Sequence, residues 1–276
     1  MFGGIWERHI GADGRVRPRW EQIGCVTGRM SCSAPNFQGF PRAAAYRAVV
    51  AAPSGRVLVT ADYSQVELRV AAALSGDEVL ADVFRRGGDA HVATAAALLG
   101  VRPEDMDDND RQLGKAANFV VMYGGGPSAL LGTARRFGVP MTAADAERHH
   151  GRLFDAYRVL MAWLRRQADE PAETRSRLGR RRLAVDSPTA RMNSAIQATA
   201  ADGMKRALGE LWRTRTTCPT AVPVLAVHDE VVVECDAADA GACRAWLVKA
   251  MTDGMQPLCG DVPVVVKAAA APTWGG

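Results

Sequence analysis

An α+β fold is predicted, because strand patterns at two distant places in the sequence enclose a long, mainly helical region. The first pattern is 57–61, an apolar and β-branched run that follows turn-forming residues at 53–55. The second is 224–234, where two short apolar runs flank His228 and Asp229 at the spacing of a β-hairpin with a two-residue loop. We therefore expect an antiparallel sheet and a separate, largely helical part.

Composition is that of an ordinary globular protein. The 276 residues are 48% hydrophobic, enough to bury the core of one large or two small domains. The net charge of +4 is compatible with a polyanionic partner and with many other functions. The six cysteines form no Cys-x-x-Cys pair, which predicts reduced thiols and no zinc site. No apolar run approaches the roughly 20 residues of a membrane span, so we expect a cytoplasmic protein.

Two aspartates stand where predicted strands end. Asp62 follows the first strand, and Asp229 lies at the tip of the predicted hairpin. Mg²⁺ is usually held by one or two carboxylates plus substrate phosphates, so the pair suggests one metal site. Each aspartate also has an ordinary explanation, Asp62 as the N-cap of the next helix and Asp229 as a common turn residue. We further expect helices at 68–74, 193–202 and 237–256, two helices within 130–168, a turn between short strands at 11–14, and a last strand at 262–267.

The segment 111–124 predicts a helix with two different faces. Its apolar face follows helical spacing and consists of Leu113, Ala116, Ala117, Val120 and Val121. On the other side Arg111, Lys115, Phe119 and Tyr123 recur every four residues. A solvated basic face would explain the two cations but not the two rings. A nucleoside triphosphate explains both, since cations would bind its phosphates and rings its base and sugar.

Three stretches in register resemble the motifs of family A DNA polymerases, the DNA polymerase I family. They are Asp-Tyr-Ser-Gln-Val-Glu-Leu-Arg at 62–69, the helix at 111–124, and Val-His-Asp-Glu at 227–230. The resemblance implies template-directed DNA synthesis from a primer 3′ hydroxyl by two-metal phosphoryl transfer. It also implies a palm-entry segment with a primer-contacting loop at 1–56, palm at 57–75 with the first catalytic motif, fingers at 76–190, and palm at 191–276 with the second catalytic motif and a C-terminal helix and strand.

The same resemblance implies the roles of the active-site residues. Two Mg²⁺ ions are expected on Asp62, Asp229 and the backbone of Tyr63, and the expected catalytic residues are Asp62, Asp229, Glu230 and Lys115. Glu67 is expected to act as a steric gate against a ribose 2′ hydroxyl. His91 has a second explanation as an ordinary residue at a helix start. The expected dNTP-binding residues are Gln65, Glu67, His91, Arg111, Lys115, Phe119 and Tyr123.

Eight residues are expected by the resemblance to contact DNA. They are Arg29, Asn36, Gln38, Arg180, Arg181, Asn193, Gln197 and His228. Arg180 and Arg181 also fit an ordinary surface patch, and the two amides of 193–197 fit buried helix caps. Four positions depart from the family pattern and weaken the expectation of minor-groove contacts: Gly39, Ala195, Ala198 and Ala226.

The expected partners are primer-template DNA and dNTPs. The sequence begins where the family's palm resumes after its thumb, so we expect low processivity and no proofreading unless a processivity or thumb-supplying protein assists. One alternative is a catalytically weak nucleic-acid-binding remnant of a larger polymerase. Another is a template-dependent RNA polymerase, which Glu67 disfavours.

Overall fold

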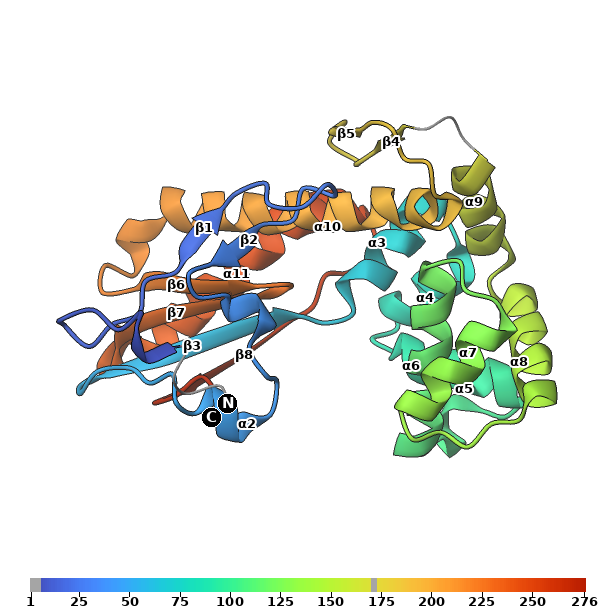
Figure 1. Cartoon of the computed structure of the whole chain (residues 1–276), viewed down its shortest axis with the longest axis horizontal. Helices are drawn as coiled ribbons and strands as arrows, with labels where there is room; N and C mark the ends of the chain where they lie inside the picture. The colour runs from blue at the N-terminus through green and yellow to red at the C-terminus, as the bar shows by residue number, and fades with distance from the viewer. Residues whose placement is uncertain (1–5, 170–172) are drawn as a thin grey trace. The chain divides into compact units, whose positions relative to one another are not determined.

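The computed structural model describes residues 6–169 and 173–276, which form two compact units (Figure 1). The sheet unit contains the described residues up to Ser64 together with Ala201–Pro257 and Val264–Gly276. The helical unit contains Gln65–Ala200 and Leu258–Pro263. Antiparallel strands in the first unit and helices in the second confirm the predicted α+β class. The assignment of palm and fingers to the ranges given above stays a prediction.

The sheet unit is built on a four-stranded antiparallel sheet in the order β6-β7-β3-β8. Its strands are β3 (Arg56–Tyr63), β6 (Val222–Val227), β7 (Glu230–Asp236) and β8 (Val266–Ala271). The predicted first strand and hairpin are confirmed, and His228 in the two-residue loop has a left-handed φ of 57°. The expected last strand at 262–267 is wrong in position. Pro263 has no N–H for a ladder, and pairing with β3 begins only at Val266.

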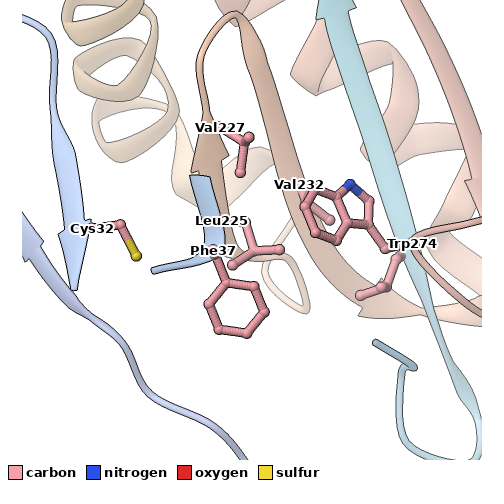
Figure 2. Close-up of a cluster of buried hydrophobic side chains, with 7 residues drawn as sticks. Cys32, Phe37, Leu225, Val227, Val232 and Trp274 are labelled. Atoms are coloured by element: carbon pink, nitrogen blue, oxygen red, sulfur yellow. The ribbon is translucent and has the colours of Figure 1, made fainter. Parts of the chain in front are cut away.

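The central strand β3 is covered on both faces. Tyr63 points to one face, where its hydroxyl donates to the carbonyl of Met251 in α11 (Ala240–Cys259) at 2.6 Å. Leu58 points to the opposite face, as the two-residue period of a strand requires. There it joins a buried cluster that Figure 2 shows, made of Cys32, Phe37, Leu58, Leu225, Val227, Val232 and Trp274. β3 is thereby packed on one face near its end and on the other face near its start.

The N-terminal part of the sheet unit contains short elements. They are β1 (Arg19–Glu21), β2 (Ser31–Ser33), η1 (Phe37–Gly39) and α2 (Ala44–Arg47). The strands expected around the turn at 11–14 are wrong, because only a single bridge forms between Ile10 and Val16. Arg15 in this turn donates both terminal nitrogens to Glu234 of β7 at 2.9 Å. This ion pair attaches the turn to β7 without extending the ladder.

Two long helices complete the sheet unit. α10 (Pro188–Arg213) begins in the helical unit and ends in the sheet unit, and it is much longer than the predicted 193–202. α11 is preceded by the short η4 (Ala237–Asp239), and η3 (Arg215–Thr217) follows α10. α10 and α11 touch at Gly254, where a Cβ would lie 2.4 Å from the backbone nitrogen of Ala207. Only glycine permits this approach of the two backbones.

The helical unit contains most of the remaining elements. They are α3 (Val66–Ser75), α4 (Glu78–Arg85), α5 (Ala90–Leu99), η2 (Pro103–Asp105), α6 (Asp108–Met122), α7 (Pro127–Arg136), α8 (Ala143–Ala156), α9 (Arg158–Asp169), β4 (Thr174–Arg175) and β5 (Arg181–Arg182). Residues 130–168 form parts of three helices where two were predicted, because the chain leaves helical geometry at Tyr157 (φ −123°, ψ 56°). No helix in the described part of the chain is long and apolar enough to cross a bilayer.

Helix α6 packs against α5 through the apolar face that the sequence predicts. All five residues of that face are buried. Gly114 lies between them at the closest approach, where a Cβ would be 1.9 Å from the carbonyl oxygen of His91 in α5. The polar side of α6 is left for the residues described below.

One buried carboxylate connects two helix starts in this unit. Asp77 is the N-cap of α4 and accepts from the backbone N–H of Leu80 at 3.0 Å, while its other oxygen accepts from the N–H of Leu160 in α9 at 2.9 Å. The variant Asp77→Ala leaves two buried donors without this acceptor, so we expect a loss of about 2 kcal/mol or more in unfolding free energy. Urea denaturation measures it, with Asp145→Ala in the α8 capping box as the control, and a smaller loss is expected there because Asp145 is partly exposed. An unchanged midpoint for Asp77→Ala would contradict this assignment.

Candidate active site

Asp62 and Asp229 lie close together at one end of the sheet. In the β3–β7 ladder Asp62 is the register partner of Glu230, the residue after Asp229. The N–H of Tyr63 donates to the carbonyl of Asp229 at 3.1 Å, which fixes the hairpin loop beside the end of β3. The N-cap of α3 is Gln65, so the alternative explanation of Asp62 as that cap is wrong. The structure brings the two predicted metal ligands together.

The carboxylates at this end of the sheet repel one another. Burial, followed by the charges of Asp229 and Glu230 and a hydrogen bond with Asp229, raises the pKa of Asp62 to about 7. The positive charge of Arg42 acts in the opposite direction. Near neutral pH Asp62 is therefore only partly ionised in the metal-free protein, whereas an isolated aspartate would be fully ionised.

Glu230 is held by two partners of its own. The indole N–H of Trp274 donates to Oε1 at 2.7 Å, and Arg47 donates to Oε2 at 3.0 Å. The guanidinium of Arg47 in turn lies 4.0 Å above the indole ring of Trp274. Both oxygens of Glu230 are therefore engaged, which suits a residue that supports the loop of Asp229 better than a direct ligand.

The polar face of α6 carries the four residues predicted from the four-residue spacing. Arg111 approaches Asp89 with Nε and Nη2 each at 2.9 Å from Oδ2. Lys115 is exposed, with its ammonium 5.4 Å from the ring centre of Phe137. The rings of Phe119 and Tyr123 lie 5.0 Å apart. Phe119 is 50% exposed, so a broad aromatic surface is available next to the cation of Lys115.

Three further predicted nucleotide ligands lie near the starts of α3 and α5. Gln65 accepts from the N–H of Ala90 at 3.1 Å, which ties the two helix starts together. The N–H of His91 donates to the N-cap Asp89 at 2.7 Å. Burial lowers the pKa of His91 to about 4, and the nearby cations of Arg111 and Lys115 add to the effect while Asp89 opposes it. Glu67 is partly buried in the first turn of α3.

The DNA contacts predicted in the sheet unit cluster near the hairpin loop. The side chain of Asn36 caps η1 by accepting from the N–H groups of Gln38 and Gly39 at 3.0 and 3.2 Å. The amide nitrogen of Gln38 donates to the carbonyls of Met30 and Ala226 at 3.1 and 3.3 Å. These two amides hold the backbone of the loop that is predicted to contact the primer. Burial, followed by the charges of Arg42 and Arg29, lowers the pKa of His228, while that of Asp229 opposes the shift.

Three of the four residues predicted to contact DNA in the helical unit are held by partners within that unit. Arg180 donates to the carbonyl of Ala198 at 2.8 Å, and Arg181 is paired with Glu173 at 2.8 Å. The side-chain amide of Gln197 donates to the hydroxyl of Tyr123 at 2.9 Å.

Asn193 is 3% exposed, and neither atom of its amide has a hydrogen-bond partner within the part of the chain that the structure describes. Because α10 begins at Pro188, Asn193 and Gln197 are not its caps. A buried amide without partners fits a site for an external polar group.

The sequence model of DNA polymerase family A matches residues 5–276 of this chain. The chain belongs to DNA polymerase family A. It is 34% identical to DNA polymerase I of Aquifex aeolicus over 272 residues, and 35% and 36% identical to the DNA polymerase I proteins of Pseudomonas aeruginosa and Thermus thermophilus. Each match covers 95% of this family A chain but only 46%, 30% and 32% of the relative. The chain therefore spans less than half the length of these relatives.

A solved structure shows the same likeness. The POL domain of Pol1 from M. smegmatis, in complex with DNA primer-template and dNTP, matches with a TM-score of 0.88 and 27% identity. The match covers 99% of this family A chain and 50% of the other chain.

Several residues that shape this family A site were not predicted from the sequence. The charge of Arg42 lowers the pKa of Asp62, and Arg47 and Trp274 hold Glu230. Arg42 and Arg47 lie in or near α2, a four-residue helix with no periodic pattern, and Trp274 is more than 40 positions from its partner. Asn118 of α6 was also missed, and the only sequence signal for it is its position next to Phe119. In the structure its amide contacts three residues of α5.

The donor atoms at the end of the sheet fit a hard divalent cation. Among residues 6–169 and 173–276, no three acidic, histidine or cysteine side chains converge as a closed metal cage. Mg²⁺ does not require one, because it is commonly bound by one or two carboxylates together with water and substrate phosphates. Asp62 and Asp229, close enough to raise the pKa of Asp62, supply that number of carboxylates.

The repulsion predicts how the metal-free protein responds to pH. The pKa of Asp62 is about 7 in the folded protein, against an ordinary value of 3.8 in the unfolded chain. Between pH 3.8 and about pH 7 the folded protein therefore binds more protons than the unfolded chain, and its stability falls as the pH rises through this range. Asp229→Asn removes one source of repulsion. Because Asp62 is exposed and solvent screens the repulsion, in EDTA we expect its unfolding midpoint to exceed that of the wild type by only about 1 °C at about pH 8, with a smaller difference at about pH 5. A lower midpoint for the variant at the higher pH would contradict the electrostatic account.

Proposed function

We propose that this protein carries out template-directed DNA synthesis. In this reaction the 3′ hydroxyl oxygen of a primer attacks the α-phosphorus of a dNTP, the bond to the leaving oxygen breaks, and pyrophosphate is released. The observation that carries the proposal is the convergence of Asp62 and Asp229 at the ends of two adjacent strands. Membership of DNA polymerase family A supports it.

The proposal gives the sheet unit the metal-binding role. Asp62, Asp229 and the backbone carbonyl of Tyr63 would hold two Mg²⁺ ions. When bound, such ions lower the pKa of the attacking hydroxyl and neutralise charge on the phosphates. Glu230, fixed by Arg47 and Trp274, keeps the loop of Asp229 in place.

The proposal gives the helical unit the nucleotide-binding role. Arg111 and Lys115 would bind phosphate oxygens by charge-assisted hydrogen bonds, with Lys115 stabilising the charge that develops on the leaving pyrophosphate. Phe119 would pack on the sugar and base, and Tyr123, held by Gln197, would close the nascent base pair. Asp89 keeps the guanidinium of Arg111 in position near His91.

DNA contacts complete the proposal. In the sheet unit Arg29, Asn36, Gln38 and His228 would contact the primer side, and the hydrogen bonds made by the two amides hold the backbone of their loop. In the helical unit Arg180, Arg181, Asn193 and Gln197 would contact the duplex or template. Asn193 has the strongest structural support, since its buried amide lacks an internal partner in the described residues.

Glu67 is proposed to select deoxyribonucleotides by filling the space that a ribose 2′ hydroxyl needs. We expect Glu67→Ala to raise incorporation of rNTPs relative to dNTPs by about 10²-fold. The wild-type side chain would clash with the ribose 2′ hydroxyl and leave that hydroxyl without a hydrogen-bond partner, and the variant would remove the clash. Single-nucleotide incorporation with matched dNTP and rNTP measures the ratio, and Glu78→Ala on the exposed start of α4 is the control. Unchanged sugar selectivity in Glu67→Ala would show that the gate lies elsewhere.

Primer extension by the wild-type chain tests the proposal as a whole. Extension with dNTPs on a primed DNA template supports it, whereas extension with rNTPs alone would favour the RNA polymerase alternative. Binding of primer-template without extension, at enzyme in excess over primer, would favour the catalytically weak remnant. Low processivity, the absence of proofreading and the need for a partner protein stay predictions for the 276-residue chain.

A further inference from the structure

We propose that Asn118 is a positioning residue that holds His91 as the tautomer with its proton on Nε2. The proposal rests on the proposed function for one step only, the identification of a dNTP phosphate oxygen as the acceptor of that proton. The tautomer itself follows from contacts inside the helical unit.

The contact between the two side chains has one chemical interpretation. Asn118 lies on α6, is 5% exposed, and places its amide nitrogen 3.1 Å from Nδ1 of His91. An amide NH₂ group can donate but not accept, so Nδ1 must offer its lone pair. In a neutral imidazole the proton then resides on Nε2, because the bond made by one ring nitrogen decides which nitrogen is protonated.

The orientation of the Asn118 amide is fixed by its other contacts. Its nitrogen also donates to the carbonyl oxygen of Ala90 at 3.3 Å, and a carbonyl only accepts. Its oxygen lies 3.1 Å from the hydroxyl of Thr94. Rotating the amide by 180° would place oxygen against the Ala90 carbonyl oxygen and against the Nδ1 position at once.

A buried network keeps Asn118 in this orientation. The hydroxyl of Thr94 lies 2.7 Å from the carbonyl oxygen of Ala90 and 3.1 Å from the side-chain oxygen of Asn118, and it can donate to either. It also lies 3.0 Å from the hydroxyl of Tyr157. Thr94, Asn118 and Tyr157 are all buried. The network therefore spans α5, α6 and the α8–α9 junction, and a hydrogen bond deep in such a network resists rearrangement.

The tautomer matters because His91 is neutral. Burial and the cations Arg111 and Lys115 disfavour the imidazolium, and Asp89 at the α5 N-cap is the acid that opposes them. The neighbouring Tyr157 stays protonated, since burial raises its pKa. A neutral ring has one N–H group, and phosphate oxygens accept hydrogen bonds. Only the Nε2–H form lets the ring donate to phosphate while Nδ1 is engaged by Asn118.

An NMR measurement on the nucleotide-free protein tests the tautomer without any variant. A long-range ¹H–¹⁵N spectrum of the imidazole groups distinguishes a protonated Nε2 from a protonated Nδ1, and the loss of one spin system in His91→Gln assigns it among the five histidines. We expect an unprotonated Nδ1 and a protonated Nε2. A protonated Nδ1, or an imidazolium at neutral pH, would overturn the proposal.

Two substitutions of the same residue test its action through His91. Asn118→Asp keeps the shape but offers only acceptors, so the spectrum should change to a protonated Nδ1 or an imidazolium. Asn118→Ala removes the contact, and a mixture of tautomers is expected. Asn109→Asp, the same exchange at an exposed position of α6, is the matched control and should leave the spectrum unchanged.

A double-mutant cycle separates positioning from a general effect on folding. In a chain that keeps His91, we expect Asn118→Ala to lower kcat/KM for dNTP by about tenfold, the size expected for the hydrogen bond from His91 to a charged phosphate. In a chain that already carries His91→Ala, we expect Asn118→Ala to lower kcat/KM by less than about twofold. Equal losses in both backgrounds would show that Asn118 acts on the fold and would overturn the positioning role. If the wild type fails to extend primers, the proposed function fails, while the spectrum still decides the tautomer.

Discussion

Asp229→Asn is expected to lower kcat/KM for nucleotide incorporation by about 10³-fold or more, which corresponds to roughly 4 kcal/mol of transition-state stabilisation. The side chain keeps its shape, and the hairpin loop keeps the backbone bond between Tyr63 and Asp229. The loss therefore measures the missing charge. Because the same variant is expected to be more stable than the wild type above neutral pH without metal, unfolding cannot explain the loss.

Single-turnover primer extension at saturating Mg²⁺ measures this effect. Asp253→Asn is the matched control, because it removes one carboxylate of an exposed ion pair with Lys249 on α11 in the same unit. Its activity should equal that of the wild type. Activity of Asp229→Asn within about tenfold of the wild type would be too high for a metal ligand.

The second large effect is expected at Lys115. Its exposed ammonium is proposed to bind the triphosphate and to stabilise the leaving pyrophosphate, so Lys115→Ala should lower kcat/KM by about 10²-fold or more, with kcat reduced as well as KM raised. The side chain is exposed on α6, and we expect the fold to be unchanged. Steady-state incorporation of a single dNTP separates the two parameters.

The control for Lys115 removes a cation from the neighbouring helix. Arg135→Ala lies on an exposed position of α7 and lowers the charge of the same unit by the same amount. Its kcat and KM should match those of the wild type. If both variants lose activity equally, the effect is one of overall charge and Lys115 has no specific role.

Local patterns in the sequence predicted much of the fold. The apolar run at 57–61 and the two-residue loop at His228 and Asp229 specified β3 and the β6–β7 hairpin, because strands and tight turns depend on adjacent residues. The four-residue spacing on α6 likewise specified its two faces. The convergence of Asp62 with Asp229 required the assumption that their strands pair, and the family resemblance supported that assumption.

Contacts between distant residues could not be predicted in this way. Nothing in the sequence pairs Glu230 with Trp274 or Arg47. The first contact depends on the path of the chain after β8, and the second on the position of α2. The start of β8 was misplaced because the apolar residues before it continue the strand pattern although the ladder begins only at Val266. The contacts of Asn118 could not be predicted either, because its three partners lie on another helix, α5.

Local oxidative cleavage tests the central claim most directly. Fe²⁺ replaces Mg²⁺ at sites made of carboxylates, and with ascorbate and peroxide it cuts the backbone next to the ion. If Asp62 and Asp229 share one divalent-cation site, cuts will occur near both residues in the same sample, and excess Mg²⁺ will suppress them together. Cuts near one residue only, or cuts that Mg²⁺ does not suppress, would contradict the account.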